Sequence, residues 1–170
     1  MRFLLLLVVL VSWAAQSEEC DTFFSDDQVH VMQRAYDFGK DLGYGFTLAA
    51  IAWRESSAGV NLIRFDPPYT YKSASYGVFH NYLTTVMNRE GCGSPACASK
   101  LAERLLTDFS FAASNAIKEI KYWEKVHGRG NLSNILNGYN DGYRGSEKGD
   151  RYADDVSDKI LYLKLCLRFG

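Results

Sequence analysis

The sequence has no block or stripe of basic residues and almost no excess of either charge. It contains 19 Lys and Arg residues against 20 Asp and Glu residues, which gives a formal net charge of -1 at pH 7. Proteins that attract nucleic acid electrostatically present a strongly basic face or tail. We therefore expect no nucleic-acid partner.

The sequence also lacks strand-like alternation of useful length, internal repeats and a linker between two parts. Its 170 residues, 47% apolar and 23% charged, are enough for one domain with a hydrophobic core. We predict a single all-α domain over residues 18–170, with loops at residues 65–77 and 137–150. The expected helices cover residues 25–43, 47–55, 78–89, 99–107, 108–127, 132–136 and 151–168. Ser25 and Gln28 have the spacing of a capping box.

Histidine is scarce, and its three copies at positions 30, 80 and 127 are isolated from one another and from the cysteines. We therefore expect no metal site and no cofactor. The four cysteines allow three pairings. "CGSPAC" is a tight loop in which Cys92 and Cys97 are expected to pair, which leaves Cys20 with Cys166. These bonds are structural in this interpretation, and they require an oxidising compartment.

The first 17 residues, "MRFLLLLVVLVSWAAQS", have the layout of a secretory signal peptide. Arg2 precedes an uninterrupted apolar run at residues 3–11, and small residues follow. The run is short for a membrane span, although an uncleaved anchor is the alternative. The "EEC" before Cys20 does not resemble a lipoprotein cleavage site. We expect export to the periplasm or the medium, with no stable membrane span after cleavage.

Glu55 lies on an apolar helix stripe with Leu48 and Ile51. A buried ionised carboxylate is costly unless it is paired, so two interpretations arise. In the first, Glu55 forms a structural ion pair with Arg64 or Lys72. In the second, an apolar pocket keeps Glu55 protonated as a general acid, as in glycosidases.

Two further stretches favour the second interpretation. "SASYGVFH", residues 73–80, places Gly77 at the expected start of a helix, where a ligand can approach the backbone closely. "LNGYNDG", residues 136–142, places Tyr139 and Asn140 between glycines. A tyrosine there can reach a carboxyl group or a sugar with its hydroxyl.

Taken in order, "ES" at residues 55–56, "SYGVF" and "GYNDG" resemble the three motifs of lytic transglycosylases related to the goose-type lysozymes. The family motifs are Glu-Ser at a helix end, a Gly-Leu-Met-Gln-like segment and Ala-Tyr-Asn-Ala-Gly. "RYADDV" also resembles the Tyr-Val segment that follows them, and the likeness covers residues 45–160. The chain departs from the family at Val78, Phe79, His80, Gly138 and Asp141.

The resemblance implies a monomeric lysozyme-like helical domain whose cleft binds the glycan strands of peptidoglycan. Glu55 would protonate the β-1,4 bond between N-acetylmuramic acid and N-acetylglucosamine. As a base it would then activate the muramoyl 6-hydroxyl, which gives a 1,6-anhydro end. Tyr139 would orient Glu55 or the sugar. The implied substrate-binding residues are Ser56, Ser75, Tyr76, Gly77, Val78, Phe79, His80 and Asn140.

Two alternatives remain open. A hydrolytic muramidase needs a second carboxylate, for which Asp66 is the candidate and Asp141 a weaker one. A secreted glycan-binding module that has lost turnover would account for the altered second motif. Several tyrosines are further candidates for a sugar groove, namely Tyr69, Tyr71, Tyr76, Tyr82 and Tyr143.

Overall fold

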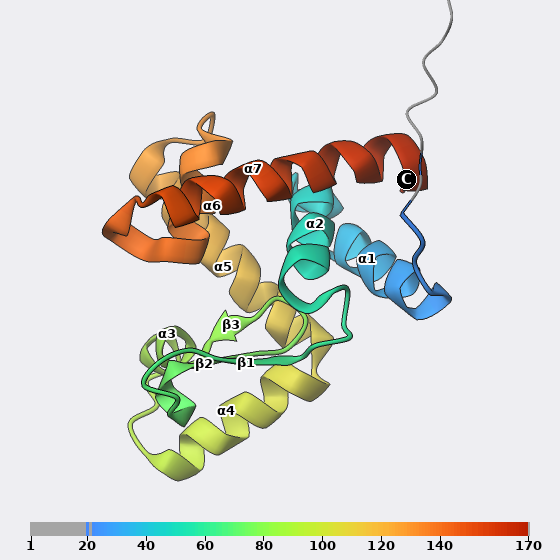
Figure 1. Cartoon of the computed structure of the whole chain (residues 1–170). Coiled ribbons are helices and arrows are strands. Elements are labelled where there is room, and N and C mark those ends of the chain that lie inside the picture. Colours follow the sequence, from blue (N-terminus) through green and yellow to red (C-terminus); the bar gives the residue numbers. More distant parts are fainter. Residues whose placement is uncertain (1–19, 21, 170) are drawn as a thin grey trace, which may run out of the picture.

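The protein is mainly helical, as the sequence predicts. The computed structural model describes residue 20 and residues 22–169, and the predicted signal peptide lies outside this part. Within it the chain forms seven α-helices and three short strands (Figure 1). The helices are α1 (Asp26–Gly39), α2 (Gly45–Ser56), α3 (Leu83–Arg89), α4 (Pro95–Thr107), α5 (Phe109–His127), α6 (Leu132–Asp141) and α7 (Glu147–Tyr162). The strands are β1 (Ile63–Phe65), β2 (Ala74–Tyr76) and β3 (Asn81–Tyr82).

A small antiparallel sheet corrects the purely all-α prediction. Its strand order is β1-β2-β3, and Arg64, Ser75 and Tyr82 are neighbours in one row across it. Strands of two or three residues are too short to give a recognisable alternation of apolar and polar residues. The sheet occupies part of the predicted loop at residues 65–77.

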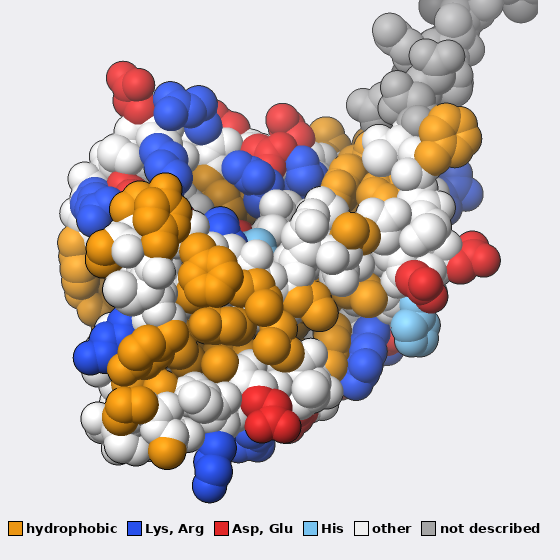
Figure 2. Space-filling model, turned by 60° about the horizontal axis from the view of Figure 1, so that its bottom comes forward, with side chains coloured by type: hydrophobic (Ala, Val, Ile, Leu, Met, Phe, Trp, Pro, Cys, Tyr) orange, Lys and Arg blue, Asp and Glu red, His pale blue; other side chains and the backbone are white. Residues whose placement is uncertain are grey.

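The long helix α5 runs through the middle of the molecule (Figure 1). Helices α1, α2, α6 and α7 lie on one side of it, and the sheet lies with α3 and α4 on the other. Fully buried residues join these helices in one core, including Leu48 and Ile51 of α2, Ile120 of α5 and Leu136 of α6. Figure 2 shows a hollow bordered by charged side chains above a broad area of hydrophobic ones.

Helix α1 begins with the predicted capping box. The Gln28 backbone N–H donates to Ser25 Oγ at 3.3 Å, and the Ser25 backbone N–H donates to Gln28 Oε1 at 2.9 Å. Two reciprocal bonds thus satisfy donors that a helix start leaves free.

Several predicted helix boundaries are wrong, and α4 begins at Pro95 and not at residue 99. Helix α3 begins at Leu83, not at residue 78, because residues 77–80 form a turn in which Gly77 and His80 have positive φ angles. The predicted loop at residues 137–150 is mostly helical, since α6 continues to Asp141 and α7 begins at Glu147. Two of its glycines, Gly138 and Gly149, serve close packing, whereas Gly142 and Gly145 have positive φ angles and open space at their Cβ positions. A Cβ on Gly138 would lie 2.4 Å from Trp123 Cδ2 of α5.

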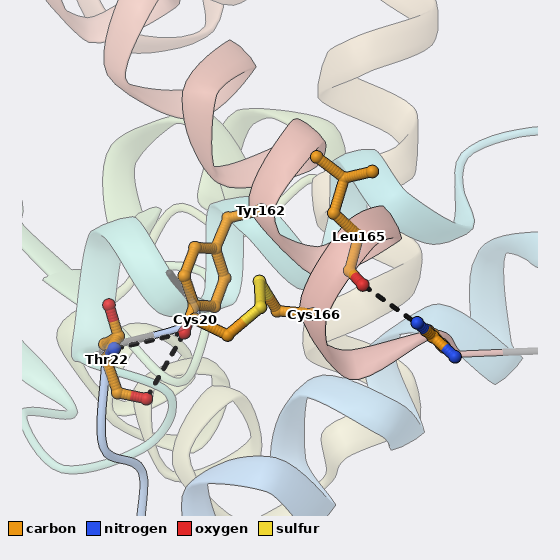
Figure 3. Close-up of a disulfide and its surroundings, with 6 residues drawn as sticks. Cys20, Thr22, Tyr162, Leu165 and Cys166 are labelled. Carbon is orange, nitrogen blue, oxygen red and sulfur yellow. Dashed lines mark hydrogen bonds between the residues drawn. A yellow bond between two sulfur atoms is a disulfide. The ribbon is translucent and has the colours of Figure 1, made fainter. Parts of the chain in front are cut away.

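The structure contains both disulfides that the sequence predicts. The bond between Cys20 and Cys166 joins the N-terminal segment to the turn of helix that continues α7 (Figure 3). Beside it, the Thr22 backbone N–H donates to the Tyr162 hydroxyl at 3.1 Å. The second bond joins Cys92 to Cys97 in the first turn of α4. None of the described helices is long and apolar enough to cross a membrane.

Candidate active site

A cleft of about 590 Å³ lies between the sheet and α3 on one side and α6 with the start of α7 on the other. Glu55 of α2 and Glu119 of α5 also line it. Each of these elements contributes a charged side chain, and the cations of the cleft are Arg64, Arg89, Arg144 and Lys148. The cleft therefore brings together residues that are far apart in the sequence.

Glu55 is buried at the C-terminal end of α2, with 4% of its side chain exposed. Arg64 Nη1 donates to its Oε2 at 2.8 Å, and His80 Nδ1 lies 3.3 Å from the same oxygen. The expectation of a purely apolar pocket is therefore wrong. Arg64 is one of the two ion-pair partners that the sequence suggested, whereas the backbone oxygen of Lys72 accepts a bond from Thr84.

Strand alternation explains why Arg64 reaches this site. Arg64 shares a row with Ser75 and Tyr82, and all three line the cleft. Its neighbours Ile63 and Phe65 lie on the opposite face of β1 and are exposed to solvent. Arg64 Nε also lies 3.4 Å from Asp66 Oδ2, so one guanidinium contacts both candidate carboxylates.

The electrostatics of this group favour a charged Arg64. Burial lowers the pKa of its guanidinium, but the negative charges of Glu55 and Asp66 outweigh that effect and raise the pKa overall. Arg64 therefore holds its proton throughout and acts at the site as a fixed positive charge.

Several buried polar atoms at the site have no hydrogen-bond partner among the described residues. They are Ser75 Oγ, Asn140 Oδ1 and His80 Nδ1, the last of which faces Glu55. Ser75 is fully buried, and both Ser75 and Asn140 line the cleft. Because most buried polar groups in proteins are paired, a cluster of unpaired ones beside a cleft is the arrangement expected of a polar ligand site.

Tyr139 and Tyr152 stack on each other, with ring centroids 6.3 Å apart. The Tyr139 hydroxyl donates to the Phe79 backbone oxygen at 3.1 Å. This bond differs from the expected one, in which Tyr139 holds Glu55 or the sugar. Burial and then the charge of Glu55 raise the pKa of both phenols well above the ordinary value for tyrosine. Both tyrosines therefore keep their protons at neutral pH.

Two predicted substrate-binding residues, Ser56 and Gly77, contact backbone atoms of the protein itself. Ser56 is fully buried, where its hydroxyl donates to the Ala52 oxygen at 3.0 Å and accepts from the Gly59 N–H at 2.8 Å. At Gly77, with φ +79°, a Cβ would lie 2.2 Å from the Leu105 backbone oxygen of α4. Gly77 thus permits close approach to another helix and not to a ligand.

The other residues of the second motif divide between core and cleft. Phe79 is fully buried against the Phe109 ring, Val78 packs on the core, and the pKa of buried Tyr76 is raised by burial. These three residues do not line the cleft, whereas Ser75 and His80 do. The turn at residues 77–80 determines which of these side chains line the cleft and which enter the core, and the sequence alone did not reveal this turn.

Of the five candidate groove tyrosines, only Tyr82 lines the cleft. Tyr69, Tyr71 and Tyr143 are exposed but are not among its lining residues, and Tyr76 is buried. The structure therefore places one of the five candidate tyrosines in the lining of the cleft.

The cleft contains a second charged pair that the sequence did not indicate. Arg89 Nη2 of α3 donates to Glu119 Oε2 of α5 at 2.6 Å, and Trp123 Nε1 donates to the other carboxylate oxygen at 2.8 Å. Thirty positions separate Arg89 from Glu119, so no local spacing could have indicated the contact. In the part of the chain that the structure describes, no three His, Cys, Asp or Glu residues are placed to hold a metal ion.

The chain is similar to a protein of known sequence from Enterobacteria phage T4. The two are 32% identical over 174 residues, which cover 94% of this chain and 92% of the T4 protein. The T4 protein is described as an uncharacterized 20.7 kDa protein in the vs-regB intergenic region. No family model matches the chain, and no solved structure matches it significantly.

Proposed function

The chain belongs to the same family as this T4 protein, and we propose that it cleaves the glycan strands of peptidoglycan without adding water. The single observation that carries the proposal is the environment of Glu55. This carboxyl group is 4% exposed and lines the cleft, as do Ser75 and Asn140, whose buried oxygens have no partner among the described residues. Such a carboxyl is suited to act as a general acid.

The arrangement around Glu55 supports a lysozyme-like fold as part of the proposal. A helix ends at the glutamate, a small antiparallel sheet follows, and a helical segment carrying Tyr139 and Asn140 forms the opposite wall of the cleft. This is the chain order in which the three motifs occur. We propose that the mature domain is exported and acts on the wall as a monomer.

In the proposed reaction, Glu55 gives its proton to the glycosidic oxygen. The muramoyl 6-hydroxyl then attacks the anomeric carbon and returns its own proton to Glu55. The leaving chain keeps a new hydroxyl, the other chain ends in a 1,6-anhydro sugar, and Glu55 is protonated again. Ser75 and Asn140 would donate to or accept from the sugar.

A hydrolytic muramidase is the second candidate, and the position of Asp66 favours it. Asp66 lines the same cleft as Glu55, and Arg64 contacts both side chains. Hydrolases use a second carboxylate either as nucleophile or to activate water. In this mechanism Asp66→Asn would abolish cleavage, whereas the proposed transglycosylase keeps most of its activity in that variant.

The proposal is tested by the release of soluble fragments from purified peptidoglycan. We expect Glu55→Gln to lose at least about 100-fold in rate while it still sediments with insoluble wall material. Glu103→Gln on the exposed face of α4 is the matched control and keeps full activity. If the unaltered protein binds the wall but releases nothing, the chain is a binding module and the proposed activity is wrong.

A further inference from the structure

His80 occupies a strained and buried position beside the candidate acid. It lies in the turn between β2 and β3 with φ +44°, a region that few residues other than glycine adopt. Only 4% of its side chain is exposed. Residues in such conformations persist where surrounding contacts hold them, and they gather at functional sites.

The contacts of the imidazole ring define where its protons lie. His80 Nε2 is 2.7 Å from the Asn61 backbone oxygen. A carbonyl oxygen only accepts hydrogen bonds, so Nε2 must carry the hydrogen at this contact. In a neutral ring, Nδ1 then presents a lone pair.

That lone pair would face an oxygen of Glu55. His80 Nδ1 lies 3.3 Å from Oε2, and it forms no hydrogen bond with any of the described residues. A lone pair and a carboxylate oxygen repel each other at this distance. The contact is favourable only when one proton lies between the two atoms, on either the ring or the carboxyl group.

The other groups near this pair cannot supply that proton. Arg64 lies 2.8 Å from Oε2 but stays charged and keeps its own protons. Tyr139 and Tyr152 hold their phenolic protons tightly, and the raised pKa of each is due first to burial. Asp66 contacts Arg64 on the far side of the guanidinium.

We propose that His80 is a positioning residue that shares one proton with Glu55. Through this contact the acid retains a proton although Arg64 lies beside it. This inference rests on the proposed function in assigning Glu55 as the acid. The proton count balances, because the pair starts with one proton, gives it to the glycosidic oxygen and regains one from the 6-hydroxyl. The resembling family has glutamine at this position. A histidine that shares a proton with the acid is therefore a feature of this chain's own sequence.

The pH dependence of kcat/KM on purified peptidoglycan tests the role of His80. Asn tolerates positive φ angles and has no titratable ring, so His80→Asn preserves the turn. A ring nitrogen normally keeps a proton to higher pH than a carboxyl group does. We expect the alkaline limb of the profile to move to lower pH by about one pH unit in this variant. Activity on the acid side should stay within about threefold of the unaltered protein.

His30→Asn on the exposed face of α1 is the matched control, and its profile should not move. A merely structural role for His80 predicts an equal loss at every pH. An equal loss, or an unchanged profile in His80→Asn, would overturn the proposal.

A second measurement does not depend on activity. In ¹⁵N NMR spectra at pH 7, we expect the His80 Nδ1 signal to be displaced toward its protonated position. In Glu55→Met, which cannot share a proton, the signal should return to that of an unprotonated Nδ1 while Nε2 keeps its hydrogen. The same Nδ1 signal in both proteins would overturn the proposal. If the displacement occurs but the unaltered protein cleaves no peptidoglycan, the proposed function fails and the shared proton stands.

Discussion

Gly138 shows how a single residue determines the packing of α6 against α5. The resembling family has alanine at this position, but here the Trp123 ring of α5 lies where the methyl group would be. Trp123 is itself buried and donates to Glu119 in the cleft. The glycine therefore allows α6 to approach α5 closely and places Tyr139 and Asn140 at the cleft.

We predict that Gly138→Ala lowers the free energy of unfolding by about 1–3 kcal/mol, because the added methyl group must displace a buried ring. Urea denaturation monitored by circular dichroism measures the loss. Gly130→Ala is the control, since nothing lies within 4 Å of its Cβ position. Equal stability of the Gly138 and Gly130 variants would contradict the packing argument.

The sequence reveals which side chains can do chemistry more readily than where they point. The apolar stripe on α2 identified Glu55 as a buried carboxylate and suggested Arg64 as its partner. The family resemblance placed Ser56 and Gly77 at the substrate, although one caps the end of α2 and the other contacts α4. The placement of these two residues depends on turns with positive φ angles, and residue type alone does not determine where such turns occur.

At the scale of elements, helix starts are marked by local chemistry and can be read from the sequence. The capping box of α1 is made by residues three positions apart, so its spacing is visible in the chain. By contrast, α6 and α7 continue through a segment rich in glycine and asparagine because tertiary packing outweighs their low helix propensity.

Replacing Ser25 with alanine should therefore cost about 1 kcal/mol of unfolding free energy, through loss of the bond from the Gln28 N–H. Thermal or urea denaturation provides the measurement. Ser99→Ala, in the exposed middle of α4, serves as the matched control and should not destabilise the protein. The capping argument is wrong if Ser25→Ala is as stable as Ser99→Ala.

At the scale of the whole molecule, the mainly helical class and the cysteine connectivity could be predicted because both rest on composition and short spacings. The cleft could not be predicted. Its lining runs from Glu55 to Lys148 and depends on how the sheet faces α6 across α5. Pairs such as Arg89 and Glu119 exist only once the domain has folded.

The disulfide between Cys20 and Cys166 spans 146 positions, so it restricts the unfolded chain far more than the bond between Cys92 and Cys97, which spans five. We predict that replacing Cys20 and Cys166 with serine lowers the free energy of unfolding by about 2–4 kcal/mol. Replacing Cys92 and Cys97 should cost less. Denaturation of both double variants under non-reducing conditions compares them, and an equal or reversed order would contradict the prediction.

The most direct test of the central claim is mass spectrometry of the fragments that the protein releases from purified peptidoglycan. We predict disaccharide-peptide products that end in 1,6-anhydro-N-acetylmuramic acid, formed by the unaltered protein and lost in Glu55→Gln. Fragments that are heavier by one water, with new reducing ends, would assign the chain to the hydrolases. Equal absence of products from both proteins would contradict the catalytic role of Glu55 altogether.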